Sequence, residues 1–227
     1  KGSFEQGTKK PDVNMKGGCH INAFSLTMSC TTPGAFIRYT TDGSAPTLIN
    51  GLDYTAPVAV SRTTRIIARA FKPGFQPSDA RIETYIFVDP ALSPSNTNLP
   101  IVVVDTLGAP IVSDVANKPW TRCISVIVDV DAATGRADIT GPQHFNGLGQ
   151  IRYRGESTYG NRHFRVEMLD EYDVDKKVSL LDMPAESDWV LSSDQLDYTS
   201  MKKGLAYKWF QDMGHYAPRQ QYVELYL

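Results

Sequence analysis

The sequence predicts an α+β protein that is mostly β-structure, with a small antiparallel β-sandwich followed by a second unit of sheet plus one helix. Three observations support this. Residues 11–88 contain short runs of alternating apolar and polar residues, separated by turns rich in Gly, Pro, Asp and Ser. Residues 89–98 are rich in Pro, Ser and Asn, as in a linker. Residues 99–227 contain longer strand patterns and one segment with helical periodicity.

The first unit, residues 11–88, lacks helical periodicity and reads as a series of short strands. The strand candidates are FSLTMSC, AFIRYTT, PVAV, TRIIARAF and RIETYIFV, and the turns between them include TTPG, TDGSAPT and KPGFQPS. This order is typical of a β-sandwich. Because the strands close a core among themselves, we expect residues 11–88 to fold alone.

The second unit, residues 99–227, begins with the strand patterns IVVVDT and CISVIVDV and continues with QIRYRG and RHFRVEML on either side of ESTYGN. The segment 199–213 predicts a helix, and Gly214 stands where a left-handed C-terminal cap is expected. An amphipathic helix beside a sheet buries its apolar face, so we expect the apolar stripe in the core. The stripe consists of Met201, Leu205, Ala206, Trp209, Phe210 and Met213.

Composition narrows the class of partner. The hydrophobic fraction of 41% suits a folded chain with a core, and the formal charge of −2 comes without a block of Lys or Arg that would follow a phosphate backbone. We therefore expect no nucleic-acid partner. No apolar run approaches the roughly 20 residues of a membrane-spanning helix, and the first residues lack a signal-peptide core.

The cysteines and acidic residues predict no disulfide framework and no metal site. Cys30 shares the parity of the apolar positions in FSLTMSC, so we expect it to point into a core, and pairing with Cys19 is not expected. Asp129, Asp131 and Asp138 lack the spacing of an EF-hand loop, and a hairpin turn accounts for them.

The first unit resembles the chitobiase/β-hexosaminidase C-terminal domain. The residues that carry the resemblance are GAFIRYTTDGSAPT, YTAPVAV, TTRIIARAFKPGFQPS and the strand ETYIF. The resemblance implies an immunoglobulin-like sandwich that serves mainly as a spacer. In the turn TDGSAPT we expect Asp42 to cap main-chain amides and Gly43 to adopt an unusual φ. Carbohydrate binding would require an exposed platform of aromatic residues, for which Tyr54, Phe71 and Phe75 are the candidates.

The second unit resembles the spore-coat protein CotH family, whose members have a kinase-like fold and include ATP-dependent kinases. The segments that carry this resemblance are LPIVVVDT, IRYRGESTYG, FRVEM, KKVSLLDMPAESDWVL and DYTSMKKGLAYKWFQDMGHYAPRQQYVELYL. The resemblance implies that residues 99–227 form the N-terminal part of such a domain, a lobe of antiparallel sheet with one packed helix. RGESTYGN then corresponds to a turn that covers nucleotide phosphates.

Two departures from the family pattern bear on the nucleotide site. Where the family shows a Pro and two Lys, this chain has Asn161, Arg162 and His163, and where the family shows an Arg-Asn pair, it has Lys202 and Lys203. The resemblance implies that any contact with the phosphates of ATP, bound with magnesium, comes from three residues of the turn, Arg154, Ser157 and Arg162. The metal-binding and catalytic acids of related proteins lie in a second lobe beyond the matched part, so we predict no catalytic residue here and no kinase activity from these residues alone.

These observations predict an extracellular or cell-surface structural protein, and the alternative is an atypical protein kinase whose catalytic lobe follows. The terminal run from Gln221 to Leu227 alternates Tyr222, Glu224 and Tyr226 with apolar residues, as in a strand with one apolar face. We therefore expect a protein partner or neighbouring subunit along this strand.

Overall fold

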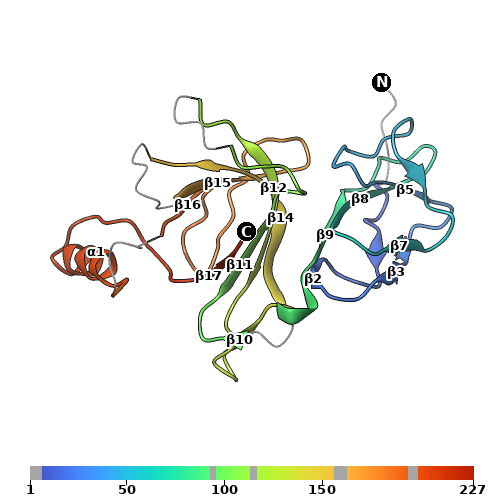
Figure 1. Ribbon diagram of the computed structural model, residues 1–227. Helices are drawn as coiled ribbons and strands as arrows, with labels where there is room; N and C mark the ends of the chain where they lie inside the picture. The colour runs from blue at the N-terminus through green and yellow to red at the C-terminus, as the bar shows by residue number, and fades with distance from the viewer. Residues whose placement is uncertain (1–6, 93–95, 113–116, 156–162, 194–198) are drawn as a thin grey trace.

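The structure, a computed structural model, describes residues 7–92, 96–112, 117–155, 163–193 and 199–227. Within this part of the chain the protein is mostly β-structure with one α-helix, which confirms the predicted fold class (Figure 1). The strands form two main sheets that lie side by side, one from each unit. No helix in the described ranges is long and apolar enough to cross a membrane.

The N-terminal unit is a β-sandwich. Its five-stranded sheet has the order β2-β9-β8-β5-β6, and two small ladders, β1 with β4 and β3 with β7, complete it. The strands are β1 (Asp12–Val13), β2 (Gly18–His20), β3 (Phe24–Leu26), β4 (Met28–Ser29), β5 (Phe36–Thr40), β6 (Leu52–Asp53), β7 (Val58–Val60), β8 (Thr64–Phe71) and β9 (Arg81–Phe87).

The long strand β8 shows how alternation builds this core. Ile66, Ala68 and Ala70 pack with Leu26 and Val60 in one buried cluster. Because successive side chains of a strand point to opposite faces, the intervening residues of β8 lie on the other face of the sheet, toward the second unit. Two of them are arginines, Arg65 and Arg69.

The run FSLTMSC forms two strands, where the sequence predicted one. Phe24–Leu26 pairs with β7, Met28–Ser29 pairs with β1, and Thr27 lies between them. The predicted parity nevertheless holds, because Leu26, Met28 and Cys30 all contact the sandwich core. Cys30 is half-buried, and all three cysteines are free thiols.

The turn after β5 is built as predicted. Asp42 accepts hydrogen bonds at Oδ1 from the main-chain N of Ser44 at 2.9 Å and from its hydroxyl at 2.6 Å. Gly43 has a φ of +85°, in the left-handed region that a residue with a Cβ adopts at a cost.

The segment between the units is short and contains local structure. Within 89–98 it forms a 3₁₀ turn, η1 (Pro90–Leu92), and a strand, β10 (Asn96–Thr97), which pairs with β13 (Ala137–Asp138). Arg136 strengthens this pairing by donating to the main-chain carbonyl of Asn96 at 2.7 Å.

The C-terminal unit is a curled six-stranded sheet of order β16-β15-β14-β12-β11-β17. Its strands are β11 (Ile101–Asp105), β12 (Thr121–Val128), β14 (Gln143–Tyr153), β15 (Phe164–Leu169), β16 (Asp188–Leu191) and β17 (Glu224–Tyr226). The predicted antiparallel arrangement needs one correction, because β17 pairs parallel to β11. The chain reaches this edge after the helix and enters it in the same direction as β11.

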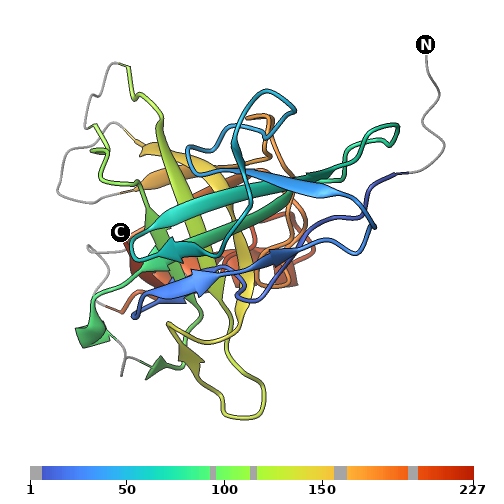
Figure 2. The same cartoon turned by 90° about the vertical axis from the view of Figure 1, so that its right-hand side faces the viewer.

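The two units share a hydrophobic core. Cys19 of β2 and Ile86 of β9 pack in one buried cluster with Ile101, Val103 and Ile124 of the six-stranded sheet. We call this interface the seam. Figure 2 shows the strands of the sandwich crossing in front of those of the second sheet. The opposite face of β11 and β12 packs in a second cluster, so these strands are buried on both faces, as their continuous apolar runs require.

The predicted helix exists as α1 (Lys202–Asp212), and Gly214 follows it with a φ of +84°. The predicted burial of its apolar stripe is wrong for the described residues, since none of the helix residues is buried. Trp209 is 63% exposed and Met213 is 65% exposed. The helix instead contacts the chain that follows it, for example where Gln211 donates to the carbonyl of Ala217 at 3.1 Å. Periodicity predicts an apolar face but does not specify what covers it.

Candidate functional site

The predicted phosphate-covering turn begins where β14 ends. The main-chain N of Arg154 donates to the carbonyl of His163 at 2.8 Å and thereby closes the base of the turn. The side chain of Arg154 is exposed. Ser157 and Arg162 lie outside the described residues, so their predicted contacts with phosphate stay predictions.

Beside this turn, the structure brings together three polar side chains from separate segments. Lys203 Nζ donates to Ser192 Oγ at 2.7 Å, and Ser192 Oγ lies 3.2 Å from Nδ1 of His163. The main-chain N of Ser193 also donates to this Nδ1 at 3.3 Å, so Nδ1 is an acceptor and a neutral ring carries its proton on Nε2. We call His163, Ser192 and Lys203 the turn cluster.

The turn cluster was only partly visible in the sequence. In the sequence, His163 and Lys203 stand out only as departures from the family pattern, and nothing in that pattern points to Ser192. The one local signal is the pair of serines directly after the strand DWVL. With an ammonium group, a hydroxyl and an imidazole beside the exposed Arg154, this end of the sheet has the donors that an anionic ligand requires.

Two further arginines on the same sheet are already engaged. Arg152 lies 4.1 Å from the ring centroid of Trp120, and Arg165 lies 5.6 Å from the same centroid. Arg165 also pairs with Asp188 at 2.6 Å, and this hydrogen bond raises the pKa of Arg165 above its usual value. Both cations therefore stabilise the sheet surface through neighbours within the chain.

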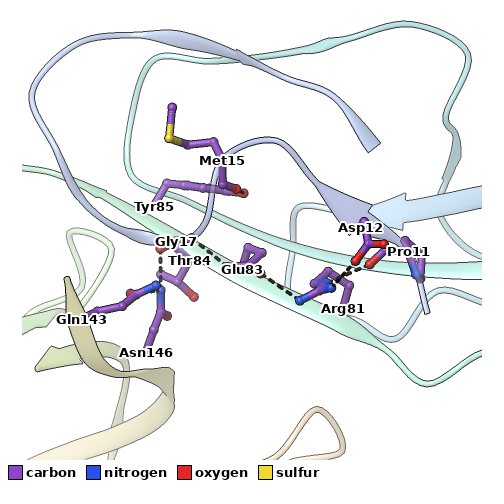
Figure 3. A network of polar contacts seen from close by, with 10 residues as sticks. All are labelled: Pro11, Asp12, Met15, Gly17, Arg81, Glu83, Thr84, Tyr85, Gln143 and Asn146. Carbon is purple, nitrogen blue, oxygen red and sulfur yellow. Dashed lines mark hydrogen bonds and ion pairs between the residues drawn. The ribbon is translucent and has the colours of Figure 1, made fainter. Parts of the chain in front are cut away.

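The seam carries a second set of polar contacts (Figure 3). Asn146 on β14 donates from Nδ2 to the main-chain carbonyl of Thr84 on β9 and to the side-chain oxygen of Gln143, both at 2.9 Å. Gly17 lies against the same atoms, with no room for a Cβ. The two sheets are thus joined by a specific polar contact in addition to the shared core.

Next to this contact, β9 holds the N-terminal segment on the sandwich. Glu83, which is buried, accepts from the main-chain N of Gly17 at 2.7 Å, and the Tyr85 hydroxyl donates to the carbonyl of Met15 at 2.8 Å. Arg81 pairs with Asp12 at 2.9 Å (Figure 3). Burial raises the pKa of Tyr85, so its hydroxyl keeps the proton that it donates. The arrangement is that of a structural clamp, because each polar group has a partner within the chain.

The aromatic residues considered for carbohydrate binding do not form one exposed platform. Phe71 is 4% exposed and stacks on Phe36, with ring centroids 5.9 Å apart. Tyr54 packs against the sandwich core. Phe75 lies below the ammonium group of Lys72, 4.2 Å from its ring centroid. The predicted aspartate turn is also structural, since Asp131 accepts from the main-chain N of Ala133 and of Thr134.

Comparison with known proteins identifies two family models. Residues 15–82 match the model described as chitobiase/beta-hexosaminidase C-terminal domain, and residues 151–227 match the model described as CotH kinase protein. Among solved structures, fibronectin(III)-like modules of CbhA from Clostridium thermocellum are 13% identical, with 79% of this chain and 90% of that chain covered and a TM-score of 0.23. A search of curated proteins finds no significant match.

Proposed function

Because the chain carries a chitobiase/beta-hexosaminidase C-terminal domain followed by part of a CotH domain, we propose that it is an extracellular or cell-surface structural protein. In this proposal the immunoglobulin-like unit is a spacer, and the second unit joins a neighbouring subunit. The shared core and the Asn146 contact support the spacer role, since they hold the two units together as one body.

The observation that carries the proposal is the free edge of the six-stranded sheet. Strand β17 is the last strand in the order, so its outer edge has no partner strand in the described part of the chain. Unpaired N–H and C=O groups on an edge are a template for a strand from another chain. Exposed apolar side chains accompany this edge, with Leu225 at 37%, Leu227 at 60% and Tyr222 at 42% exposure.

The strand is shorter than the sequence predicted. It covers Glu224–Tyr226, whereas the alternation ran from Gln221 to Leu227. Its inner side is anchored, because Tyr226 packs against the seam core and Val223 packs against the second cluster of the sheet. A strand from a second copy of this chain would pair with the outer edge of β17 and cover the exposed leucines.

Light scattering coupled to size-exclusion chromatography tests the proposal. We expect the chain to associate with rising concentration and the Leu225→Lys variant to remain monomeric, because a buried ammonium opposes strand addition. Leu48→Lys is the matched control, since Leu48 is 63% exposed and lies in the sandwich. A chain that stays monomeric at high concentration would contradict the proposal. Surface labelling of intact source cells with an impermeant reagent tests the location.

The alternative, nucleotide binding by a kinase-like lobe, is favoured by the turn cluster beside Arg154 and by the match to the CotH kinase protein model. Titration calorimetry with ATP and magnesium measures it. We expect Lys203→Ala, Arg154→Ala and Arg162→Ala each to weaken binding if the phosphates lie at this turn. Lys208→Ala is the control, because Lys208 lies on the same helix and pairs with Asp212 at 2.5 Å. No heat of binding would leave the structural proposal in place and exclude this one.

A further inference from the structure

A cavity of about 1080 Å³ lies between the two units, at one end of the seam. One wall comes from the sandwich and includes Gly43 in the turn after β5 and Arg65 in β8. The other wall comes from the second unit and includes Asp105, Arg122 and Asp173. The cavity therefore exists only because the two sheets are joined.

Arg65 is the unusual residue of this cavity. Its side chain is 4% exposed, and Nε and Nη2 are buried with no hydrogen-bond partner in the part of the chain that the structure describes. Alternation along β8 explains its position, since Ile66 points into the sandwich core and Arg65 to the opposite face. The remaining nitrogen, Nη1, lies beside Gly43, where a Cβ would be 3.8 Å away. A buried guanidinium without partners is rare and costly.

The charges around Arg65 leave it without a dedicated carboxylate. Burial lowers the pKa of Arg65 to about 10, and repulsion from Arg122 adds to this effect, while Asp173 and Glu171 oppose it. Asp173, however, forms an ion pair with Arg122, and this contact lowers the pKa of Asp173.

The other two carboxylates of the cavity are also engaged. Asp42 accepts from Ser44 in its own turn, and Asp105 accepts from the main-chain N of Leu107 at 2.6 Å. The lining thus contains carboxylates that have their own partners, and one buried guanidinium whose Nε and Nη2 have no hydrogen-bond partner among the described residues.

We propose that the cavity binds an oxyanion group, a phosphate or a carboxylate, at Arg65. The oxyanion accepts from the guanidinium and offsets its buried charge, and it also relieves the repulsion between Arg65 and Arg122. A guanidinium is suited to this role, because its N–H groups form charge-assisted hydrogen bonds with the oxygens of either group. The ligand bridges the two units, so binding stabilises the seam.

Thermal unfolding with added anions tests the proposal on the whole chain. We expect inorganic phosphate to raise the melting temperature above that in chloride at matched ionic strength. Acetate and citrate, measured in the same way, show whether a carboxylate also stabilises the chain. Calorimetry is expected to show binding at least about tenfold weaker in Arg65→Met, because charge-assisted hydrogen bonds are the strong ones. Arg136→Met is the matched control, since it removes one positive charge far from the cavity, where Arg136 contacts Asn96.

One further variant and one reference condition make the result decisive. Arg122→Gln, at a half-exposed position, removes the second guanidinium and is expected to weaken binding if Arg65→Met does not fold. In chloride, Arg65→Met is expected to be at least as stable as the native chain, because it removes an uncompensated buried charge. Equal anion effects in the native chain and Arg65→Met would overturn the proposal. So would a strong loss of stability of Arg65→Met in chloride, which would assign the guanidinium a purely structural role.

Discussion

Asn146 of β14 and Thr84 of β9 are joined across the seam by a hydrogen bond of 2.9 Å from the side-chain amide to the main-chain carbonyl. The two residues are 62 positions apart in the sequence and belong to different sheets. Their contact fixes how the sandwich sits on the second sheet, because an amide donor must be directed at the carbonyl that it satisfies.

Replacing Asn146 by Ala is expected to lower the free energy of unfolding by about 1–3 kcal/mol, because the Thr84 carbonyl then loses a partner in a buried place. Urea denaturation measures the change. Asn22→Ala is the control, since Asn22 is exposed. Equal stability of the two variants would show that water replaces the amide without cost.

Gly17→Ala is expected to destabilise the chain by about 1–3 kcal/mol, the usual cost of overpacking. A Cβ at this position would overlap the side-chain amide of Asn146 and would lie 2.7 Å from the main-chain N of Thr84. Gly7→Ala is the control, because a Cβ there has open space. Thermal unfolding of both variants distinguishes a loss of fit at the seam from a general effect of removing glycine.

Ile86→Ala is expected to cost about 2–5 kcal/mol, since it opens a cavity in the core that both units share. Ile49→Ala, at a residue that is 95% exposed, is expected to change little. The chain should also unfold in one transition, because the shared core couples the units. Two separate transitions in calorimetry, with only one of them affected by Ile86→Ala, would contradict this coupling.

The buried thiols predict a loss of stability at alkaline pH. Burial raises the pKa of Cys19 and of Cys123 from 9.0 to about 12. The folded state therefore holds these protons more tightly than the unfolded state. Their contribution to stability is complete below pH 9.0 and is lost as the pH rises toward about 12.

The measurement is the difference in unfolding free energy between the native chain and Cys19→Ala, recorded from about pH 8 to pH 11. We expect the native chain to lose stability more steeply than the variant above pH 9.0. The comparison isolates the thiol, because every other titrating group is common to both proteins. Parallel curves would show that Cys19 ionises equally in both states.

The sequence by itself determined the local structure of this protein. The Asp42 and Gly43 turn and the Gly214 cap depend on neighbouring residues and are present as predicted. Most predicted strands and the helix are also present, although FSLTMSC forms two strands and the helix covers 202–212 instead of 199–213. The hydrogen bond between Arg154 and His163 joins the ends of β14 and β15, two strands that were also predicted from their local patterns. Steric preferences and short-range hydrogen bonds act within a few residues, so a single sequence displays them.

The tertiary structure alone decided what those elements contact. The parallel pairing of β17 with β11 and the turn cluster of His163, Ser192 and Lys203 join segments far apart in the chain. The exposure of the apolar stripe of α1 and the burial of Arg65 likewise depend on what the rest of the fold places beside them. No local pattern encodes such contacts, because they depend on how segments distant in the sequence pack in three dimensions. The same alternation that placed Ile66 in the sandwich core placed Arg65 on the opposite face, and only the second sheet turned that face into a buried one.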